Sequence, residues 1–264
     1  MDYKIQKKVA LITGSTQGIG FATARKLCAE GVSVVINGRN QANVDKAVEK
    51  LQKEFPLTSV QGVVADLKDA KGCNKLLREV AHIDILINNM GVFVPKDFAD
   101  ISDEEWLDMF NINVMSGVRL SRHYLSKMLE QDWGRIIFIS SESAIQIPKE
   151  MIHYGMSKTA QISIARGIAE LTKGTSVTCN SILAGPTKSE GVEDFMGSLG
   201  AKDNKTFEEV EQDFFKSVRP TSLLQRFADV DECANLICFV ASSLSSATNG
   251  AALRVDGGVV QSAF

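Results

Sequence analysis

Short apolar runs alternate with amphipathic segments along most of the chain. Runs such as KVALITG and GRIIFISS are apolar almost throughout, which is typical of strands that a sheet buries on both faces. The segments between them repeat apolar residues at the spacing of a helix. The predicted strands cover residues 8–14, 32–38, 59–67, 83–91, 134–141, 175–185 and 250–258. The predicted helices cover residues 21–31, 41–55, 69–82, 103–132, 153–174 and 229–242.

This alternation predicts an α/β protein with a doubly wound parallel sheet, the Rossmann fold, with about seven strands and helices on both faces. We expect the strand order 3-2-1-4-5-6-7. No repeat, low-complexity tract or linker interrupts the pattern, so we expect a single domain over residues 1–264. The long helix predicted over residues 103–132 should break near Asn111–Asn113.

Residues 188–220 are polar and loosely patterned, with helix-like pieces. FMGSLG, FEEV and FFKSV within this segment carry apolar side chains at helical spacing. We interpret the segment either as a lid that closes over a mainly apolar substrate or as a lid that only packs on the body of the protein. Substrate specificity is expected here, with contributions from Phe93, Val94 and the 144–151 loop.

Composition and charge exclude several classes of function. The formal net charge of −3 gives no electrostatic case for binding nucleic acid or an anionic membrane surface. No stretch approaches the roughly 18 apolar residues of a membrane span, and the apolar run near the N-terminus is too short for a signal peptide. The five scattered cysteines and three separated histidines match neither a disulfide framework nor a metal site. We therefore expect a cytoplasmic protein with buried, reduced cysteines and no metal.

The segment TGSTQGIG, Thr13 to Gly20, follows the first predicted strand and opens the first predicted helix. Gly14, Gly18 and Gly20 allow a tight turn and a close approach to a ligand, and the helix N-terminus offers free N–H groups to a pyrophosphate. An ordinary strand-to-helix turn is the alternative interpretation. Its position between a strand and a helix favours a dinucleotide site.

Tyr154 and Lys158 lie four residues apart in a predicted helix and therefore share a face. A phenol has a pKa of about 10, and a nearby ammonium group should lower that pKa. A tyrosine tuned in this way can exchange a proton with a carbonyl oxygen. An ordinary surface pair is the alternative, so the pair needs support from the rest of the chain.

That support comes from five motifs that occur in order: TGSTQGIG, NNMG at Asn88–Gly91, NVMSG at Asn113–Gly117, Ser141, and the Tyr154–Lys158 pair. Together they make essentially the whole chain resemble the short-chain dehydrogenase/reductase family. The resemblance implies a nicotinamide-dependent oxidoreductase that transfers a hydride between its cofactor and a carbonyl or secondary alcohol. The catalytic residues that it implies are Asn113, Ser141, Tyr154 and Lys158.

Neighbouring residues compete for two of these roles. Ser140 and Ser143 are alternatives to Ser141 as the serine that bonds the substrate oxygen. Asn111 is the rival of Asn113, which in the family holds a water leading to the lysine. The resemblance also implies a set of cofactor-binding residues. They are Gly14, Ser15, Thr16, Gln17, Gly18, Ile19, Gly20, Arg39, Asp66, Leu67, Asn88, Met90, Gly91, Tyr154, Lys158, Gly185, Thr187 and Ser189.

The end of the second predicted strand favours NADP over NAD. An acidic residue there normally bonds the ribose 2′-hydroxyl of NAD, but this chain has Gly38, followed by Arg39. An arginine can bind the 2′-phosphate of NADP through charge-assisted hydrogen bonds. Gln17 stands where NADP-preferring relatives often have a basic residue. NADP is therefore the expected cofactor, with NAD as the alternative.

The chain departs from the family after the sixth predicted strand, where Ala184-Gly185 replaces the usual Pro-Gly. The resemblance places Thr187 and Ser189 at the nicotinamide. A non-catalytic redox sensor and an epimerase or dehydratase on the same fold are alternative functions. Relatives commonly assemble through helices that correspond to residues 113–131 and 152–173, so we expect a homodimer or homotetramer.

Overall fold

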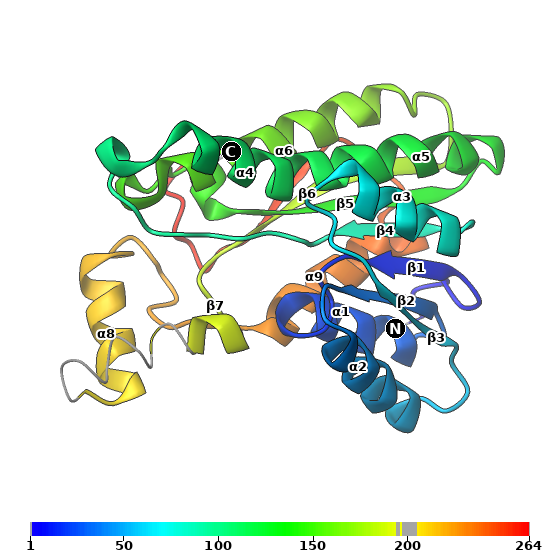
Figure 1. Ribbon diagram of the computed structural model, residues 1–264, viewed down its shortest axis with the longest axis horizontal. Helices are drawn as coiled ribbons and strands as arrows, with labels where there is room; N and C mark the ends of the chain where they lie inside the picture. The colour runs from blue at the N-terminus through cyan, green and yellow to red at the C-terminus, as the bar shows by residue number, and fades with distance from the viewer. Residues whose placement is uncertain (1, 194–195, 197–204, 264) are drawn as a thin grey trace.

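The computed structural model describes residues 2–193, 196 and 205–263. Within these residues, seven parallel strands form one sheet in the order β3-β2-β1-β4-β5-β6-β9, which confirms the predicted order (Figure 1). The strands are β1 Val9–Ile12, β2 Ser33–Gly38, β3 Val60–Val64, β4 Ile85–Asn88, β5 Gly134–Ser141, β6 Val177–Ala184 and β9 Ala252–Val255. The carboxyl ends of all seven strands therefore meet at one edge of the sheet.

Helices cover both faces of this sheet, as predicted for the Rossmann fold (Figure 1). One face packs against α1 Gly18–Ala29, α2 Gln41–Glu54 and α9 Val230–Ala241. The other packs against α3 Ala70–Glu79, α5 Ser116–Glu130 and α6 Ile152–Glu170. Successive strand residues face opposite sides, so Ala10 and Ile12 join the first apolar cluster and Leu11 joins the second.

The predicted break in the long helix is present. Helix α4 Asp103–Phe110 is followed by a π-helical turn, η2 Asn111–Met115, and then by α5. A π-helical turn inside a longer helix is frequent at functional sites. The turn buries the side chain of Asn113 and leaves Asn111 half-buried.

Several short elements have no counterpart in the prediction, because two or three residues carry no readable period. They are the 3₁₀ turns η1 Phe98–Asp100, η3 Glu142–Ala144, η4 Lys149–Met151 and η5 Ser243–Ser245, and the paired strands β7 Thr187–Lys188 and β8 Ala228–Asp229. The last two hold the chain that leaves β6 against the chain that enters α9.

The segment at residues 188–220 contains helix α8 Phe207–Ser217, which confirms one of the helix-like pieces. Residues 194–195 and 197–204, including almost all of FMGSLG, lie outside the described residues. Figure 1 shows α8 at the end of the molecule toward which the strands point. Its buried Val210 and Phe215 form an apolar cluster with Met196 and Phe227, separate from the two clusters on the sheet.

All five cysteines are buried and free, as expected. Among the residues that the structure describes, no helix has both the length and the apolar character needed to cross a membrane. Within the same residues, no three histidine, cysteine, aspartate or glutamate side chains gather as metal ligands would.

Candidate active site

Two cavities lie along the edge formed by the carboxyl ends of the strands. One, of about 340 Å³, lies over the ends of β1, β2 and β3 and is lined by Gly14, Arg39 and Asp66 among others. The second, of about 410 Å³, is lined by Ser141, Tyr154 and Lys158 among others. Both cavities are bordered by Asn89, Gly91 and Val92, so they form one continuous crevice.

The glycine loop between β1 and α1 has the geometry that its sequence predicts. Gly14 and Gly18 have φ angles of +58° and +60°, a region that side chains rarely adopt. A Cβ on Gly20 would lie 2.5 Å from Asn89 Nδ2, so the loop and the end of β4 pack too closely for any side chain there. The loop exposes Thr16 and Gln17 to the first cavity and Ile19 to the second.

Ser15 differs from its neighbours in this loop. Its side chain is fully buried, donates a hydrogen bond to Ile12 O at 2.6 Å and accepts one from Asn37 N at 3.0 Å. These contacts hold the ends of β1 and β2 together. The main-chain N–H of Ser15 is also engaged, since it donates to Asn37 O at 2.9 Å, and Ser15 lines neither cavity.

The end of β2 explains why no acidic residue stands there. A Cβ on Gly38 would lie 2.6 Å from Thr16 Cγ2 and 3.0 Å from Val44 Cγ2. An aspartate at this position would require the glycine loop or α2 to move. Arg39 is exposed at the rim of the first cavity, and Lys68, which the sequence analysis missed, lines the same cavity. Two cations thus border this end of the crevice.

The cofactor residues predicted from β3 and β4 are only partly at the crevice. Asp66, Met90 and Gly91 line it. Leu67 is fully buried in the core, and Asn88 is buried with its Nδ2 donating to Ser121 Oγ at 3.1 Å. In this structure, the neighbouring residues Ala65 and Asn89 line the crevice instead.

Lys158 projects from α6 toward the boundary between the two cavities. Its Nζ donates to Ile139 O at 2.8 Å and lies 5.6 Å from the centroid of the Tyr154 ring. A Cβ on Gly91 would lie 3.2 Å from this Nζ, so the glycine leaves room beside the amine. Burial lowers the pKa of Lys158 to about 8.

Tyr154 lies one helical turn before Lys158, on the same face of α6, at the wall of the second cavity. Burial raises the pKa of its phenol well above the ordinary value, and the Glu142 carboxylate raises it further. A hydrogen bond with Ser141 and the Arg219 guanidinium act in the opposite direction. The prediction that Lys158 lowers the pKa of this phenol is therefore wrong for the structure as it stands, because burial and Glu142 outweigh the favourable groups.

Asn113 occupies the π-helical turn and is almost fully buried. Its side chain accepts a hydrogen bond from Val92 N at 2.8 Å and donates to Val92 O at 2.9 Å, which fixes the chain after β4. Its main-chain oxygen accepts from Gln161 Nε2 at 2.6 Å, and Gln161 Oε1 accepts from Lys158 Nζ at 3.4 Å. A glutamine side chain thus bridges Asn113 and Lys158, where the family resemblance implies a water.

Three serines line the second cavity at the end of β5. The Ser140 hydroxyl is engaged with the backbone of α6, since it donates to Lys158 O at 2.9 Å. Ser141 Oγ accepts from Ser143 N at 3.1 Å and donates to the Glu142 carboxylate. Of the three serines, Ser141 is the one that acts on the pKa of the Tyr154 phenol, which favours it over its two neighbours as the partner of that phenol.

Two charged residues of this cavity, Glu142 and Arg219, escaped the sequence analysis. Both are buried, and Arg219 Nε donates to Glu142 Oε1 at 2.8 Å. The pair joins residues 77 positions apart, so no local pattern reveals it. The acidic residue directly after the predicted serine was the one available signal.

The chain after β6 borders the second cavity with Gly185, Thr187 and Ser189. A Cβ on Gly185 would lie 2.6 Å from Asp256 O, so this position requires glycine. Thr187 Oγ1 donates to Gly185 O at 2.9 Å. Ala184, which replaces the usual proline, is the last residue of β6 and pairs in register with Ser141 and Val255.

Comparison with known proteins agrees with this geometry. A family model described as short chain dehydrogenase matches residues 8–197. Two proteins of Bacillus subtilis (strain 168) are each 47% identical to the chain: the uncharacterized oxidoreductase YvaG, over all of both chains, and the uncharacterized oxidoreductase YvrD, over 99% of this chain and 100% of that protein.

Among solved structures, L-sorbose reductase from Gluconobacter frateurii, complexed with NADPH and L-sorbose, matches with a TM-score of 0.94 at 27% identity. The match covers 99% of this chain and 100% of that one. The family model covers most of this chain, and the two Bacillus subtilis proteins match 99% of it or more. The chain therefore belongs to the short-chain dehydrogenase/reductase family.

Proposed function

We propose that the protein is an NADP(H)-preferring oxidoreductase that transfers a hydride between the nicotinamide and a carbonyl or secondary alcohol. The observation that carries the proposal is the continuous crevice, in which the glycine loop borders one cavity and Ser141, Tyr154 and Lys158 border the next. We further propose that residues 1–264 form one domain, with the described part of the 188–220 segment as its lid.

The residues along the crevice fit a dinucleotide. The N-terminus of α1 offers main-chain N–H groups to the pyrophosphate, and the first cavity offers Asp66 to the adenine end. Lys158 and Gly91 border the passage between the cavities, where the nicotinamide ribose would lie. When bound, the cofactor supplies or accepts the hydride.

Support for NADP comes from charge and space at the end of β2. Gly38 leaves no carboxylate, and Arg39 and Lys68 offer two cations to a 2′-phosphate. The structurally similar L-sorbose reductase is complexed with NADPH. NAD would find no acidic partner at Gly38 for its 2′-hydroxyl.

For proton transfer we assign Tyr154 as the acid in carbonyl reduction. Hydride reaches the carbonyl carbon, the phenolic proton passes to the carbonyl oxygen, and the product is an alcohol with Tyr154 left as phenolate. Ser141 hydrogen-bonds the substrate oxygen, and Lys158 holds the hydroxyls of the nicotinamide ribose. Burial and Glu142 raise the pKa of Tyr154, so the phenol is protonated at neutral pH, as the proton donor must be.

The wall of the second cavity that faces Tyr154 is mainly apolar. Phe93 and Val92 contribute from the chain after β4, and Phe214 and Val218 contribute from α8 and the residue after it. We infer a substrate that presents a carbonyl to Ser141 and Tyr154 and an apolar body to the lid.

The test is NADPH oxidation with a panel of aldehydes and ketones, comparing the wild type with Tyr154→Phe and with Tyr3→Phe as a control. Loss of a general acid should reduce turnover by about 10²- to 10⁴-fold while NADPH binding persists. Tyr3 lies outside both cavities, so its variant should keep the wild-type rate. Near-wild-type turnover by Tyr154→Phe would refute the assignment, and NADPH binding without turnover of any carbonyl would favour a sensor.

We also propose that the protein acts in the cytoplasm as a homodimer or homotetramer. Support for assembly comes from large apolar side chains left exposed on the described surface, among them Leu107 of α4 and Leu171 just after α6. The family resemblance implies that α5 and α6 are the paired helices; Leu107 lies on α4, which packs against α6, and Leu171 lies just after α6.

A further inference from the structure

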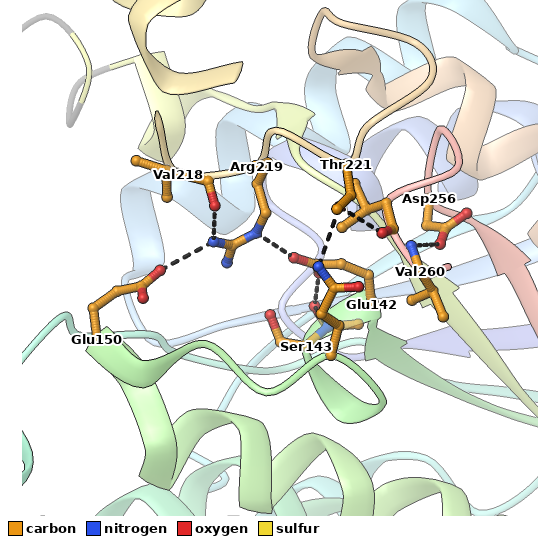
Figure 2. Close-up of polar contacts among 12 residues, drawn as sticks. Glu142, Ser143, Glu150, Val218, Arg219, Thr221, Asp256 and Val260 are labelled. Atoms are coloured by element: carbon orange, nitrogen blue, oxygen red, sulfur yellow. Dashed lines mark hydrogen bonds and ion pairs between the residues drawn. The ribbon is translucent and has the colours of Figure 1, made fainter. Parts of the chain in front are cut away.

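A buried ion pair stands beside the proposed catalytic serine. Glu142 directly follows Ser141 in the sequence, and Glu142 is only 4% exposed. One carboxylate oxygen, Oε2, accepts the hydrogen bond of the Ser141 hydroxyl, and the other, Oε1, accepts from Arg219 Nε at 2.8 Å. Figure 2 shows Arg219 between Glu142 and Glu150.

Arg219 joins three parts of the structure at this point. Its Nη1 donates to Glu150 Oε1 at 3.0 Å and to Val218 O at 3.0 Å, and its side chain is 9% exposed (Figure 2). Glu142 lies at the end of β5, Glu150 in the turn before α6, and Arg219 after α8. The guanidinium therefore holds a fixed carboxylate against the serine from the opposite side of the cavity.

The residues that follow Arg219 are fixed as well. Thr221, labelled in Figure 2, lies two residues after Arg219. Its Oγ1 accepts from Gln146 Nε2 at 3.1 Å and donates to Val259 O at 2.7 Å. Arg219 thus approaches Glu142 from a backbone held on both sides. The surrounding backbone therefore fixes the orientation of the Glu142–Arg219 pair, unlike that of an ion pair between two flexible surface side chains.

We propose that Glu142, held by Arg219, is a positioning residue that fixes the Ser141 hydroxyl beside Tyr154, an inference that rests on the proposed function. A buried ion pair is weak evidence for stability, because desolvation of its charges offsets their attraction. Its direct contact with Ser141 indicates a role in the site instead. A serine hydroxyl donates one hydrogen bond, and in this structure that proton goes to Glu142 while Ser143 N occupies one lone pair of Oγ, which leaves the other lone pair facing the Tyr154 phenol. When a carbonyl binds, the hydroxyl turns its proton from Glu142 to the substrate oxygen.

The charge of Glu142 has a second consequence at Tyr154. The charged groups around this phenol are Glu142 at the end of β5, Arg219 after α8 and Lys158 on the same helix. After burial, Glu142 is the main cause that raises the pKa of Tyr154, and Arg219 opposes it. Removing the negative charge while keeping the side-chain shape should therefore let Tyr154 lose its proton at lower pH.

The kinetic experiment compares the wild type with Glu142→Gln over a range of pH, using NADPH and a simple aldehyde such as benzaldehyde. Reduction needs a protonated Tyr154, so the alkaline limb that Tyr154 sets should move to lower pH in Glu142→Gln. A fall in kcat at unchanged NADPH affinity should accompany the shift. Glu208→Gln, which removes an exposed carboxylate from α8, should leave the limb in place.

A second measurement needs no substrate, so it separates this inference from the proposed activity. The phenolate absorbance of Tyr154 is obtained with NADP⁺ bound, as the difference between each protein and its Tyr154→Phe counterpart. In Glu142→Gln the phenolate should appear at lower pH than in the wild type. A signal that begins at the same pH in both, or in neither before unfolding, would overturn the proposal even if carbonyl reduction is established.

Arg219→Lys provides a second variant in case Glu142→Gln folds poorly. Lysine keeps the positive charge but cannot hold two carboxylates with the arginine fork. It should lower kcat several-fold with a smaller movement of the alkaline limb than Glu142→Gln. A wild-type kcat in Arg219→Lys would show that Glu142 does not need Arg219 to hold its position, and would overturn the proposal.

Discussion

Glu190 lies where the pyrophosphate of a dinucleotide would bind. Its Oε2 accepts a hydrogen bond from Gly18 N at 2.8 Å, at the first residue of α1. A helix N-terminus attracts negative charge through its free N–H groups. On the proposed function, the pyrophosphate of NADPH binds at this N-terminus and has to displace the carboxylate. We predict that Glu190→Gln binds NADPH more tightly than the wild type.

The size of the effect follows from the kind of contact. A hydrogen bond to a charged group contributes about 1.5 to 3 kcal/mol and a neutral one about 0.5 to 1.5 kcal/mol. Glutamine can still accept from Gly18 N, so the loss is the difference between the two, reduced because the contact is exposed and screened by salt. We expect about 0.5 to 1 kcal/mol, which is roughly a two- to five-fold lower Kd for NADPH.

The assay is titration of NADPH fluorescence at two ionic strengths, with Glu193→Gln as the matched control. Glu193 lies three residues further along the chain and pairs with Lys188 at 3.5 Å, not with the glycine loop. Its removal changes the net charge equally. The lowering of the Kd for NADPH by Glu190→Gln should be smaller at high salt, and Glu193→Gln should lower the Kd only slightly at either ionic strength. Equal Kd values for Glu190→Gln and the wild type at low salt would refute the reasoning.

Three further predictions concern the cofactor, the lysine and the assembly. Arg39→Ala should raise the Kd for NADPH about 5- to 30-fold, because it removes a charge-assisted contact to the 2′-phosphate, and should leave the Kd for NADH unchanged. Fluorescence titration measures both Kd values. Equal Kd values of the wild type for NADPH and NADH would contradict the proposed cofactor preference. Lys158→Met should abolish turnover yet raise the free energy of unfolding at pH 7 by roughly 1 to 2 kcal/mol. The lowered pKa of Lys158 means that burying its charge costs about 3 kcal/mol, and the variant gains this amount minus the contribution of the lost hydrogen bond to Ile139 O. The cost of burying the lysine charge is complete below pH 8 and fades as the pH rises toward 10.5, so the denaturation curves of the wild type and Lys158→Met should converge near pH 10.5. A difference in the free energy of unfolding that does not change with pH would be inconsistent with a buried charge. Light scattering at micromolar concentration should give the mass of a dimer or tetramer, and a monomer alone would exclude the proposed assembly.

The sheet was predictable because its signals are local. Each strand is a short apolar run that ends near a glycine or a polar residue, and the order of the strands follows from the alternation with helices. The break in the helix at Asn111–Asn113 was visible from two asparagines in an otherwise helical pattern. The glycine loop was predictable for the same reason, since Gly14 and Gly18 need their unusual φ angles whatever the rest of the chain does.

Individual contacts at the site were less predictable. Asn88 and Asn89 are adjacent and chemically identical, but β4 ends at Asn88, so the first is buried against Ser121 and the second faces the crevice. A one-residue difference at a strand end decides which side chain reaches a ligand. The pKa of Tyr154 was mispredicted because it depends on burial and on Glu142, neither of which the Tyr154–Lys158 spacing reveals.

The chain between β6 and α9 contacts the glycine loop near its start and borders the second cavity near its end. Glu190, near its start, bonds the glycine loop, and Arg219, near its end, holds Glu142 beside Ser141. The first contact is exposed and the second is buried, so the first is the easier to break. NADPH should therefore release the start of this chain without dismantling the polar wall that Arg219 builds at the substrate cavity. Cofactor binding and serine positioning then act through opposite ends of one segment, which is why Glu190→Gln should change cofactor affinity and Glu142→Gln should change the pH dependence, each without the other effect.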